Sequence, residues 1–214
     1  GGPQVRLNLP PWGSAFVVFA KDENAPRMDA VLRAEREADV SLPAEQVLAL
    51  DSGEVKLQCW QNGQYILQDS SGQGKVIKVD TLPAPQTLKG PWPVAFDPEW
   101  GAPAEVTLPK LMSWTDHEDE GVKYYSGAGF YKKTLDVPAD WLATGRKVHL
   151  DLGEVRDIAE VYVNGKSAGI LWKAPFRADI TSLVKPGANQ LKIEVMNLWI
   201  NRLVGDQRLP EDQR

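Results

Sequence analysis

Hydrophobic and polar residues alternate most clearly in the last third of the chain. Residues 147–152, 161–163 and 191–196 place Val, Leu or Ile at every second position, with polar or aromatic residues between. A period of two indicates a strand with one buried and one exposed face. Asn164-Gly165 separates two such runs and tolerates the positive φ angles of a type I′ turn. The region therefore predicts an antiparallel β-sandwich that contains a tight hairpin.

A weaker pattern of short apolar runs occupies the first 80 residues. It predicts strands at 5–9, 15–20, 47–51, 54–60, 64–69 and 75–80. Asn62-Gly63 predicts a hairpin between the runs on either side of it, with Trp60 opposite Tyr65 and Lys56 opposite Asp69.

The polar stretch at 21–46 interrupts these strands. Met28, Val31 and Leu32 have the spacing of one helical turn, so we expect a loop with one short helix. A proline-bearing connector at 81–89 then separates two β regions. We expect a small antiparallel β-sandwich domain at 1–82, a linker at 83–90 and a second β domain at 91–208.

Composition narrows the classes of partner. The net charge is −5, with acids and bases well mixed, which disfavours nucleic acid because its binding needs a basic surface. The same charge disfavours anionic membrane surfaces, and no apolar run approaches the roughly 18 residues of a membrane span. Cys59 is the single cysteine, which excludes an internal disulfide and a thiolate metal site. We therefore expect neither a nucleic-acid partner nor a membrane partner.

Several motifs in the second β domain carry a family resemblance. LDLGEV (150–155), AEVYVNGK (159–166), PFRADIT (175–181) and GANQLKIEV (187–195) together resemble the sugar-binding, galactose-binding-like jelly-roll domain of glycoside hydrolases. NLWINRLVGD (197–206) is similar to the C-terminal region of the family-106 α-L-rhamnosidases. The resemblance implies an all-β chain with a jelly roll at 91–208, and a parent enzyme whose catalytic carboxylates lie on a separate barrel domain.

Catalysis by this chain alone finds little support in its residues. His117 and His149 are the only histidines, no G-x-S-x-G elbow is present, and His149 alternates with core residues and so is expected on the outer face of a strand. Glu118 and Glu120 are clustered in an acidic turn, which is more typical of a solvated loop than of a pair of catalytic carboxylates. We therefore expect a non-catalytic chain.

The same acidic turn is a candidate metal site. Asp116, Glu118 and Glu120, followed by Gly121, imitate the opening of an EF-hand loop, but Gly127 stands where the bidentate glutamate is required. An EF-hand is therefore excluded. A looser structural calcium site stays open, and the resemblance supports it because galactose-binding-like domains often hold calcium.

Sugar binding needs an aromatic face for the C–H face of a sugar ring and fixed polar groups for its hydroxyls. Three clusters fit: Trp114 with Asp116 and His117; Tyr124; and Trp172 with Lys173 and Arg177. For Trp114 and Trp172, a role as core or domain-interface anchor is an equally open alternative. If they bind sugar, replacing either by Ala should weaken binding and leave the fold intact.

The leading hypothesis is a non-catalytic carbohydrate-binding accessory region of a glycoside hydrolase acting on plant cell-wall polysaccharide. Its partners would be a polysaccharide or oligosaccharide and a catalytic domain of the same parent chain, in an extracellular or periplasmic setting. The alternative is a structural C-terminal tail that packs on a catalytic barrel and binds no sugar. A protein-binding or adhesion sandwich also stays open, because sandwiches serve many functions.

Overall fold

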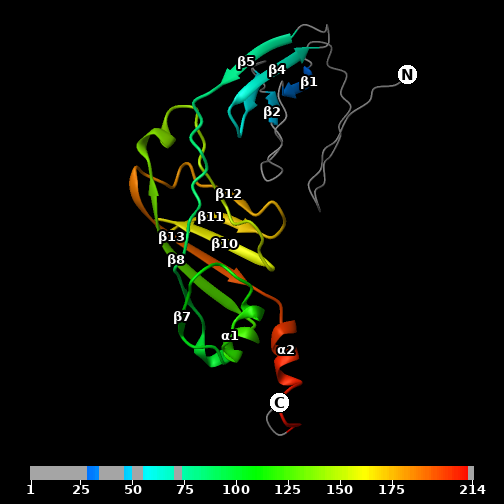
Figure 1. Ribbon diagram of the computed structural model, residues 1–214, viewed down its shortest axis with the longest axis vertical. Helices are drawn as coiled ribbons and strands as arrows, with labels where there is room; N and C mark the ends of the chain where they lie inside the picture. Colours follow the sequence, from blue (N-terminus) through cyan, green and yellow to red (C-terminus); the bar gives the residue numbers. More distant parts are fainter. Residues whose placement is uncertain (1–27, 34–45, 50–54, 70–73, 212–214) are drawn as a thin grey trace, which may run out of the picture. The chain divides into compact units, whose positions relative to one another are not determined.

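The chain divides into two compact units. The computed structural model describes residues 28–33, 46–49, 55–69 and 74–211. One unit, the small unit, spans residues 16–86, and the other, the sandwich unit, holds the chain from residue 87 onward. In both, the described strands pair only in antiparallel fashion and the helices are few and short (Figure 1). The all-β fold class is confirmed. The strands expected at 5–9 and 15–20 lie outside the described residues.

The small unit contains two antiparallel sheets. One has the order β1 (Met28–Arg33), β4 (Gly63–Asp69), β5 (Gly74–Val79), and the other pairs β2 (Gln46–Ala49) with β3 (Val55–Gln58). The helical turn expected at Met28, Val31 and Leu32 is wrong, because this segment is strand β1 with Val31 opposite Leu67. Apolar spacing over a single turn predicts a helix only weakly. Forming one turn orders several backbone dihedral angles in return for one hydrogen bond, so an isolated turn is unstable, and pairing with β4 is favoured instead.

The hairpin expected at Asn62-Gly63 is also wrong. Strand β3 pairs with β2, while β4 pairs with β1 and β5, so neither predicted cross-strand pair forms. The Asn62 amide instead contacts the end of the unit: Nδ2 donates to the Leu82 carbonyl at 2.9 Å, and Oδ1 accepts from the Leu82 N–H at 2.8 Å. Tyr65 is buried, and its hydroxyl donates to the Gln61 carbonyl at 2.6 Å.

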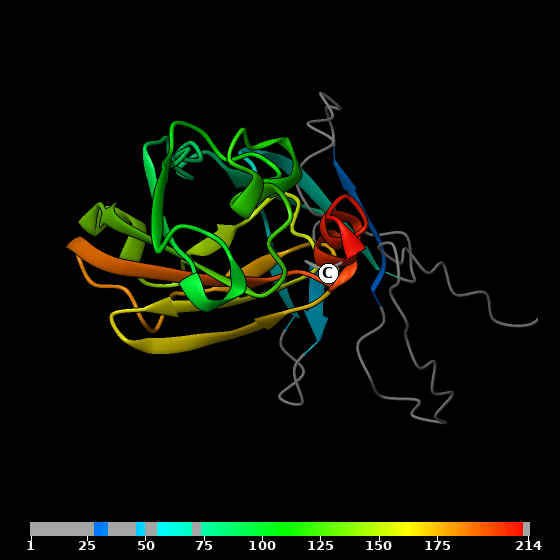
Figure 2. The ribbon, with the colours of Figure 1, turned by 90° about the horizontal axis from the view of Figure 1, so that it is seen from below.

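The sandwich unit is built on a six-stranded antiparallel sheet with the order β11-β10-β13-β8-β6-β7. The long strands β8 and β13 lie side by side in its middle (Figure 2). A second, two-stranded sheet pairs β12 (Arg177–Asp179) with β9 (His149–Asp151). The strands of the large sheet are β6 (Trp92–Ala95), β7 (Glu105–Leu108), β8 (Ala128–Val137), β10 (Ile158–Val163), β11 (Lys166–Leu171) and β13 (Gly187–Met196).

The predicted alternation in the C-terminal strands is confirmed. Val161 and Val163 on β10, and Leu191 and Ile193 on β13, are buried, while the residues between them face outward. The Asn164-Gly165 hairpin forms as predicted, with φ angles of 51° and 80° and with Val163 opposite Lys166. The core also takes Val148 and Ala178 from the two-stranded β9–β12 region.

Short helices fill the connections of this unit. They are η1 (Pro98–Trp100), η2 (Trp114–Asp116), α1 (Glu120–Lys123), η3 (Ala139–Leu142) and α2 (Ile200–Asp206). The acidic turn contains α1 because the Asp119 carboxylate caps it, accepting from the Val122 N–H at 3.1 Å. No helix within the described ranges is long and apolar enough to cross a membrane.

Candidate functional site

Trp114 lies in the core of the sandwich unit. Its ring meets those of Phe96 and Tyr125 edge to face, with centroids 5.1 and 5.8 Å away. Its Nε1 donates to the Tyr131 hydroxyl at 2.7 Å. The ring is buried, so it offers no face to a sugar. Of the two alternatives for Trp114, the structure supports the core anchor, and the expectation that Trp114→Ala leaves the fold intact is corrected accordingly.

The other members of the first cluster lie outside this core. Asp116 is exposed, and His117 is half-buried with Nδ1 accepting from the Asp119 N–H at 3.1 Å. Because Trp114 faces inward, the cluster does not combine an aromatic face with polar groups. Sequence proximity placed the three residues together, but the turn at η2 separates the ring from the two polar side chains.

The candidate calcium ligands do not gather into a site. Asp116, Glu118 and Glu120 are exposed, and within the described part of the chain no group of three His, Cys, Asp or Glu side chains could hold a metal ion. The physical reason is the local helix: Glu120 begins α1, and Asp119 between the candidate ligands is used as its cap. The proposed ligand set is therefore corrected.

Tyr124 is packed under the C-terminal helix. It ends α1, and the Arg208 guanidinium carbon lies 5.3 Å from its ring centroid. A Cβ added to Gly205 would lie 2.8 Å from the Tyr124 Cβ, which shows how closely α2 approaches this side chain. The ring of Tyr124 therefore serves mainly as a support for α2.

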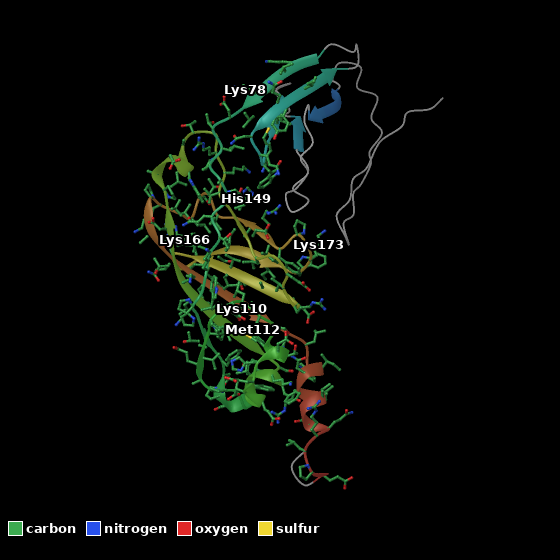
Figure 3. All side chains as sticks on the ribbon, viewed as in Figure 1. Lys78, Lys110, Met112, His149, Lys166 and Lys173 are labelled. Carbon is green, nitrogen blue, oxygen red and sulfur yellow. The ribbon has the colours of Figure 1, made fainter. Side chains whose placement is uncertain are left out.

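Trp172 is the exposed tryptophan among the sequence candidates. Its side chain is 65% exposed and follows the end of β11. It borders a hollow of about 370 Å³, which we call the Trp172 hollow. The Lys173 ammonium lies 5.5 Å from the Trp172 ring centroid, and Lys173 projects from this end of the sheet in Figure 3. The hollow is lined by Val155, Asp157, Trp172, Lys173, Ala174 and Phe176.

Arg177 supports this loop from beneath. Its side chain is only 10% exposed, and its guanidinium contacts the Asp151 carboxylate through Nη2 and through Nε, the latter at 3.1 Å. These residues are opposite each other in the β9–β12 pair. Next to them, the Phe176 carbonyl accepts from the Leu152 N–H at 2.8 Å. Arg177 therefore positions the loop and does not line the hollow.

Sequence reasoning missed four residues of the Trp172 hollow, namely Val155, Asp157, Ala174 and Phe176. Val155 and Asp157 come from the loop before β10, about fifteen residues from Trp172. No periodicity links them to the aromatic side chain, and only the pairing of β10 with β11 brings them together. Phe176 stands inside the PFRADIT motif, so a signal for it was present.

His149 is less exposed than its place in an alternating strand predicts. Its side chain is 15% exposed, and Nε2 lies 3.9 Å from Asp179 Oδ2. Burial lowers the pKa of His149, while Asp179 raises it and Lys147 and Arg177 lower it further. Asp179 on the paired strand β12 stands opposite His149. Val148 and Leu150 pack in the core, so His149 between them projects to the other side of the strand, as the alternation predicts, but most of its side chain is covered there.

A second exposed feature is the helix at the end of the chain. Leu198 and Trp199 just before α2, and Ile200, Leu203 and Val204 within it, are exposed, and we call these five side chains the apolar face of α2. Polar contacts hold the start of this segment to the sandwich unit. Asn197 Oδ1 accepts from the Gly127 N–H at 2.9 Å, and its Nδ2 donates to the Tyr125 carbonyl at 2.8 Å. Ser126 Oγ donates to the Leu198 carbonyl at 3.1 Å and accepts from the Arg202 N–H at 3.0 Å.

The sandwich unit thus combines two antiparallel sheets with an exposed tryptophan and polar groups in the loops at one end. Comparison with known families gives the class of this unit. Residues 93–213 match the family described as glycosyl hydrolases family 2, sugar binding domain. This match covers more than half of the chain, and the chain belongs to that family.

Individual relatives are glycosidases. The chain is 42% identical over 165 residues to a protein of Formosa agariphila named "Putative beta-glucuronidase", covering 77% of this chain and 14% of that protein. It is similar to the structure of a rhamnosidase from Novosphingobium sp. PP1Y, with a TM-score of 0.56 and 28% identity over 80% of this chain and 22% of the rhamnosidase. A β-glucuronidase of Ruminococcus gnavus matches over 52% of this chain and 20% of its own, with 30% identity and a TM-score of 0.44. The chain thus spans less than a quarter of these relatives.

Proposed function

We propose that this chain is a non-catalytic, carbohydrate-binding region of a glycoside hydrolase, and that it holds sugar in the Trp172 hollow. The observation that carries the proposal is the exposure of the Trp172 ring beside a hollow whose lining also offers an ammonium and a carboxylate. Large aromatic side chains are usually mostly buried, so an indole displayed next to polar groups is well suited to ligand binding.

The chemistry of the hollow suits a sugar ring. The C–H face of a pyranose would stack on Trp172, while Asp157 accepts hydrogen bonds from hydroxyls and Lys173 donates to them. The Arg177–Asp151 ion pair beneath limits movement of the loop. The site is open to solvent, so each hydrogen bond between protein and sugar replaces hydrogen bonds that both groups made to water. The net gain in binding free energy from each bond is therefore small. We therefore expect weak binding with a favourable enthalpy.

A non-catalytic role is supported by the count of carboxylates at the hollow. Glycoside hydrolysis ordinarily uses two carboxyl groups on either side of the scissile bond, about 5 to 9.5 Å apart. Among the residues that line the Trp172 hollow, Asp157 is the one carboxylate. The catalytic pair would then belong to another domain of the parent chain.

We infer a parent of the α-L-rhamnosidase type, resembling family 106 and acting on plant cell-wall polysaccharide outside the cytoplasm, in an extracellular or periplasmic setting. The likeness to a rhamnosidase over 80% of this chain supports it. The name of the Formosa relative supports a β-glucuronidase instead, and substrate tests on the parent enzyme with rhamnosides and glucuronides would separate the two.

Affinity electrophoresis of the chain tests sugar binding. Gels would contain rhamnogalacturonan, arabinan, galactan, xylan or glucan. We expect retardation on one polysaccharide, and loss of that retardation in Trp172→Ala. Trp100→Ala is a matched control, because Trp100 is 58% exposed but lies in η1 and does not line the hollow. A folded chain that migrates unretarded in every gel, or a Trp172→Ala variant retarded like the parent, would overturn the proposal.

A second candidate function rests on the apolar face of α2. Five large apolar side chains are exposed on one short segment, and Asn197 and Ser126 hold the segment in place. Exposed apolar patches of this kind mark interaction sites. We infer that this face packs on the catalytic domain of the parent chain, since the relatives extend well beyond the matched region.

Light scattering and dye binding test this second role. An uncovered apolar face should bind a hydrophobic dye and promote concentration-dependent self-association of the folded chain. Replacing Trp199 and Leu203 by Ser should abolish both effects. If the unaltered chain stays monomeric and binds no dye, the docking role fails, while sugar binding at Trp172 is unaffected by that result.

A further inference from the structure

The outer face of the six-stranded sheet carries a second hollow, far from Trp172. It measures about 380 Å³, and we call it the sheet-face hollow. It lies near the Asn164-Gly165 turn, whereas the Trp172 hollow lies at the other end of β11. Lys166 and Lys173, labelled in Figure 3, mark the two ends of that strand. The sheet-face hollow is lined by Lys132, Tyr162, Gly165, Gln190, Leu191 and Lys192.

Three neighbouring strands build this hollow in one row. Tyr162 on β10 is opposite Lys192 on β13, and Lys192 is opposite Lys132 on β8. Residues that are directly opposite on adjacent strands lie on the same face of a sheet, about 4.5–5.5 Å apart at Cβ. The register therefore places one aromatic and two lysine side chains next to one another on the same face of the sheet.

The positive charge of the hollow is only partly neutralised. The Lys192 ammonium lies 4.5 Å from the Tyr162 ring centroid and 3.7 Å from Glu194 Oε2. Lys132, by contrast, has no carboxylate within ion-pair distance among the residues that the structure describes. The lining residues include both lysines and no carboxylate.

The other acid nearby is already engaged. Glu160 Oε1 accepts from Ser167 Oγ at 2.8 Å. Hydrogen bonds from Ser167 and Tyr162 lower the pKa of Glu160, and the bond to Glu160 raises the pKa of Tyr162. The Lys192 ammonium also lowers the pKa of Glu160, so Glu160 offsets part of the positive charge of Lys192, while Lys132 on the far side of the row is not among the groups that shift the pKa of Glu160.

We propose that the sheet-face hollow is a second carbohydrate site that selects an anionic sugar. The carboxylate or sulfate of the sugar binds the ammonium groups of Lys132 and Lys192, its ring lies against Tyr162, and Gln190 bonds its hydroxyls. A cation–aromatic pair suits this role, because the ring supports the sugar while the charge selects it. This site is independent of the Trp172 hollow and goes beyond the function proposed above.

Calorimetric titration of the whole chain tests the site. The probes are trigalacturonate, its fully methyl-esterified form, and a neutral trisaccharide carrying one sulfate. We expect the first or the third to bind and the methyl ester not to bind. Which of the two anions binds identifies the source of the charge. Binding should weaken as salt is added, because exposed charges are screened.

Variants locate the binding. Lys132→Gln with Lys192→Gln should lower the affinity for the anionic probe by about fivefold or more, since the variant removes two exposed ion pairs with the anion. Lys110→Gln, an exposed lysine outside the hollow, is the matched control and should bind normally.

The background of Trp172→Ala separates this site from the Trp172 hollow. Anion binding that survives in Trp172→Ala and is lost in the double lysine variant supports the second site. Anion binding that is lost in Trp172→Ala but kept in the lysine variant overturns it and assigns the charge selection to Lys173. No binding of either anionic probe by the folded chain also overturns it, whatever the result with neutral polysaccharides.

Discussion

Trp114 and Tyr131 are joined inside the sandwich unit by a hydrogen bond of 2.7 Å from the indole Nε1 to the phenolic oxygen. Both side chains are buried, and burial raises the pKa of Tyr131. The pair links η2 to the central strand β8, and Gly129 on that strand leaves the space that the indole fills: a Cβ there would lie 2.5 Å from the Trp114 ring. Its role is therefore to hold the turn onto the sheet.

Replacing Trp114 should lower the free energy of unfolding, because Trp114 is a core residue and not a sugar-binding residue. Trp114→Phe leaves the buried Tyr131 hydroxyl without its donor, for a loss of about 1–3 kcal/mol in the free energy of unfolding. Trp114→Ala should lose about 3–5 kcal/mol. Urea unfolding measures both. In a double-mutant cycle, adding Tyr131→Phe to Trp114→Phe should recover part of the loss. Equal stability of Trp114→Phe and the unaltered chain would contradict this role.

The Asn197 side chain should stabilise the segment 198–206, which contains α2, against local unfolding. Its amide makes two hydrogen bonds to backbone groups on either side of Ser126, so Asn197→Ala leaves the partly buried Gly127 N–H and Tyr125 carbonyl without these partners. We expect a loss of about 1–3 kcal/mol in local stability, seen as faster hydrogen exchange in 198–206. Asn201→Ala is the control, because Asn201 makes no side-chain hydrogen bond within the described residues. Unchanged exchange in Asn197→Ala would contradict the prediction.

Asp179 should contribute to stability above about pH 4. Burial would raise the pKa of its carboxyl, but the hydroxyl and N–H of Thr181, with Lys147 and His149, outweigh burial and lower it to about 2. A depressed pKa stabilises the fold above the unfolded value of about 3.9, and this stability is lost as pH falls toward 2. Melting temperatures of the unaltered chain should drop over this window, and those of Asp179→Asn should be lower at pH 7 and drop less. Asp136→Asn, at an exposed site, should behave like the unaltered chain.

His149 should act in a higher pH window. Burial lowers the pKa of His149 below its ordinary value of 6.5. The fold therefore favours the neutral imidazole, so its stability is complete above about pH 6.5 and decreases as pH falls through the folded pKa. His149→Gln should remove this decrease and leave most of the Asp179 window in place, because His149 is the smallest of the contributions that lower the pKa of Asp179. The measurement is the melting temperature of both proteins between pH 7 and pH 5. If the melting temperature of His149→Gln still decreases over this range, the pH dependence belongs to another group.

Two Asn-Gly turns show how far local sequence reaches. Asn164-Gly165 forms the predicted hairpin, and its side chain adds support: Asn164 Nδ2 donates to Asn189 Oδ1 at 2.8 Å. Asn62-Gly63 has the same residues, yet the strands beside it pair elsewhere. The difference lies in the partners available at long range: Asn62 bonds Leu82 and β1 takes one side of β4. Turn propensity is one of several contributions to the free energy of the fold, and the pairing of strands outweighs it when the two conflict.

The candidate site also could be predicted only in part from the sequence. Trp114 and Trp172 were equally good candidates for sugar binding, because both stand in polar loops next to charged residues. Tertiary contacts separate them: Phe96, Tyr125 and Tyr131 surround Trp114, and no comparable aromatic cluster covers Trp172 among the described residues. The sheet-face hollow was not predicted at all, because its lysines lie sixty residues apart in the chain and meet only through the β8–β13 register.

The sequence by itself determined the all-β class, the alternating strands around 147–152, 161–163 and 191–196, and the Asn164-Gly165 hairpin. These depend on period-two alternation and on φ angles that two adjacent residues must adopt, which are local properties. Only the tertiary structure decided which tryptophan is displayed, that Asp116, Glu118 and Glu120 stay apart, and that Lys132, Tyr162 and Lys192 form one surface. Exposure and proximity depend on contacts between strands that are distant in the chain, and no local pattern records them.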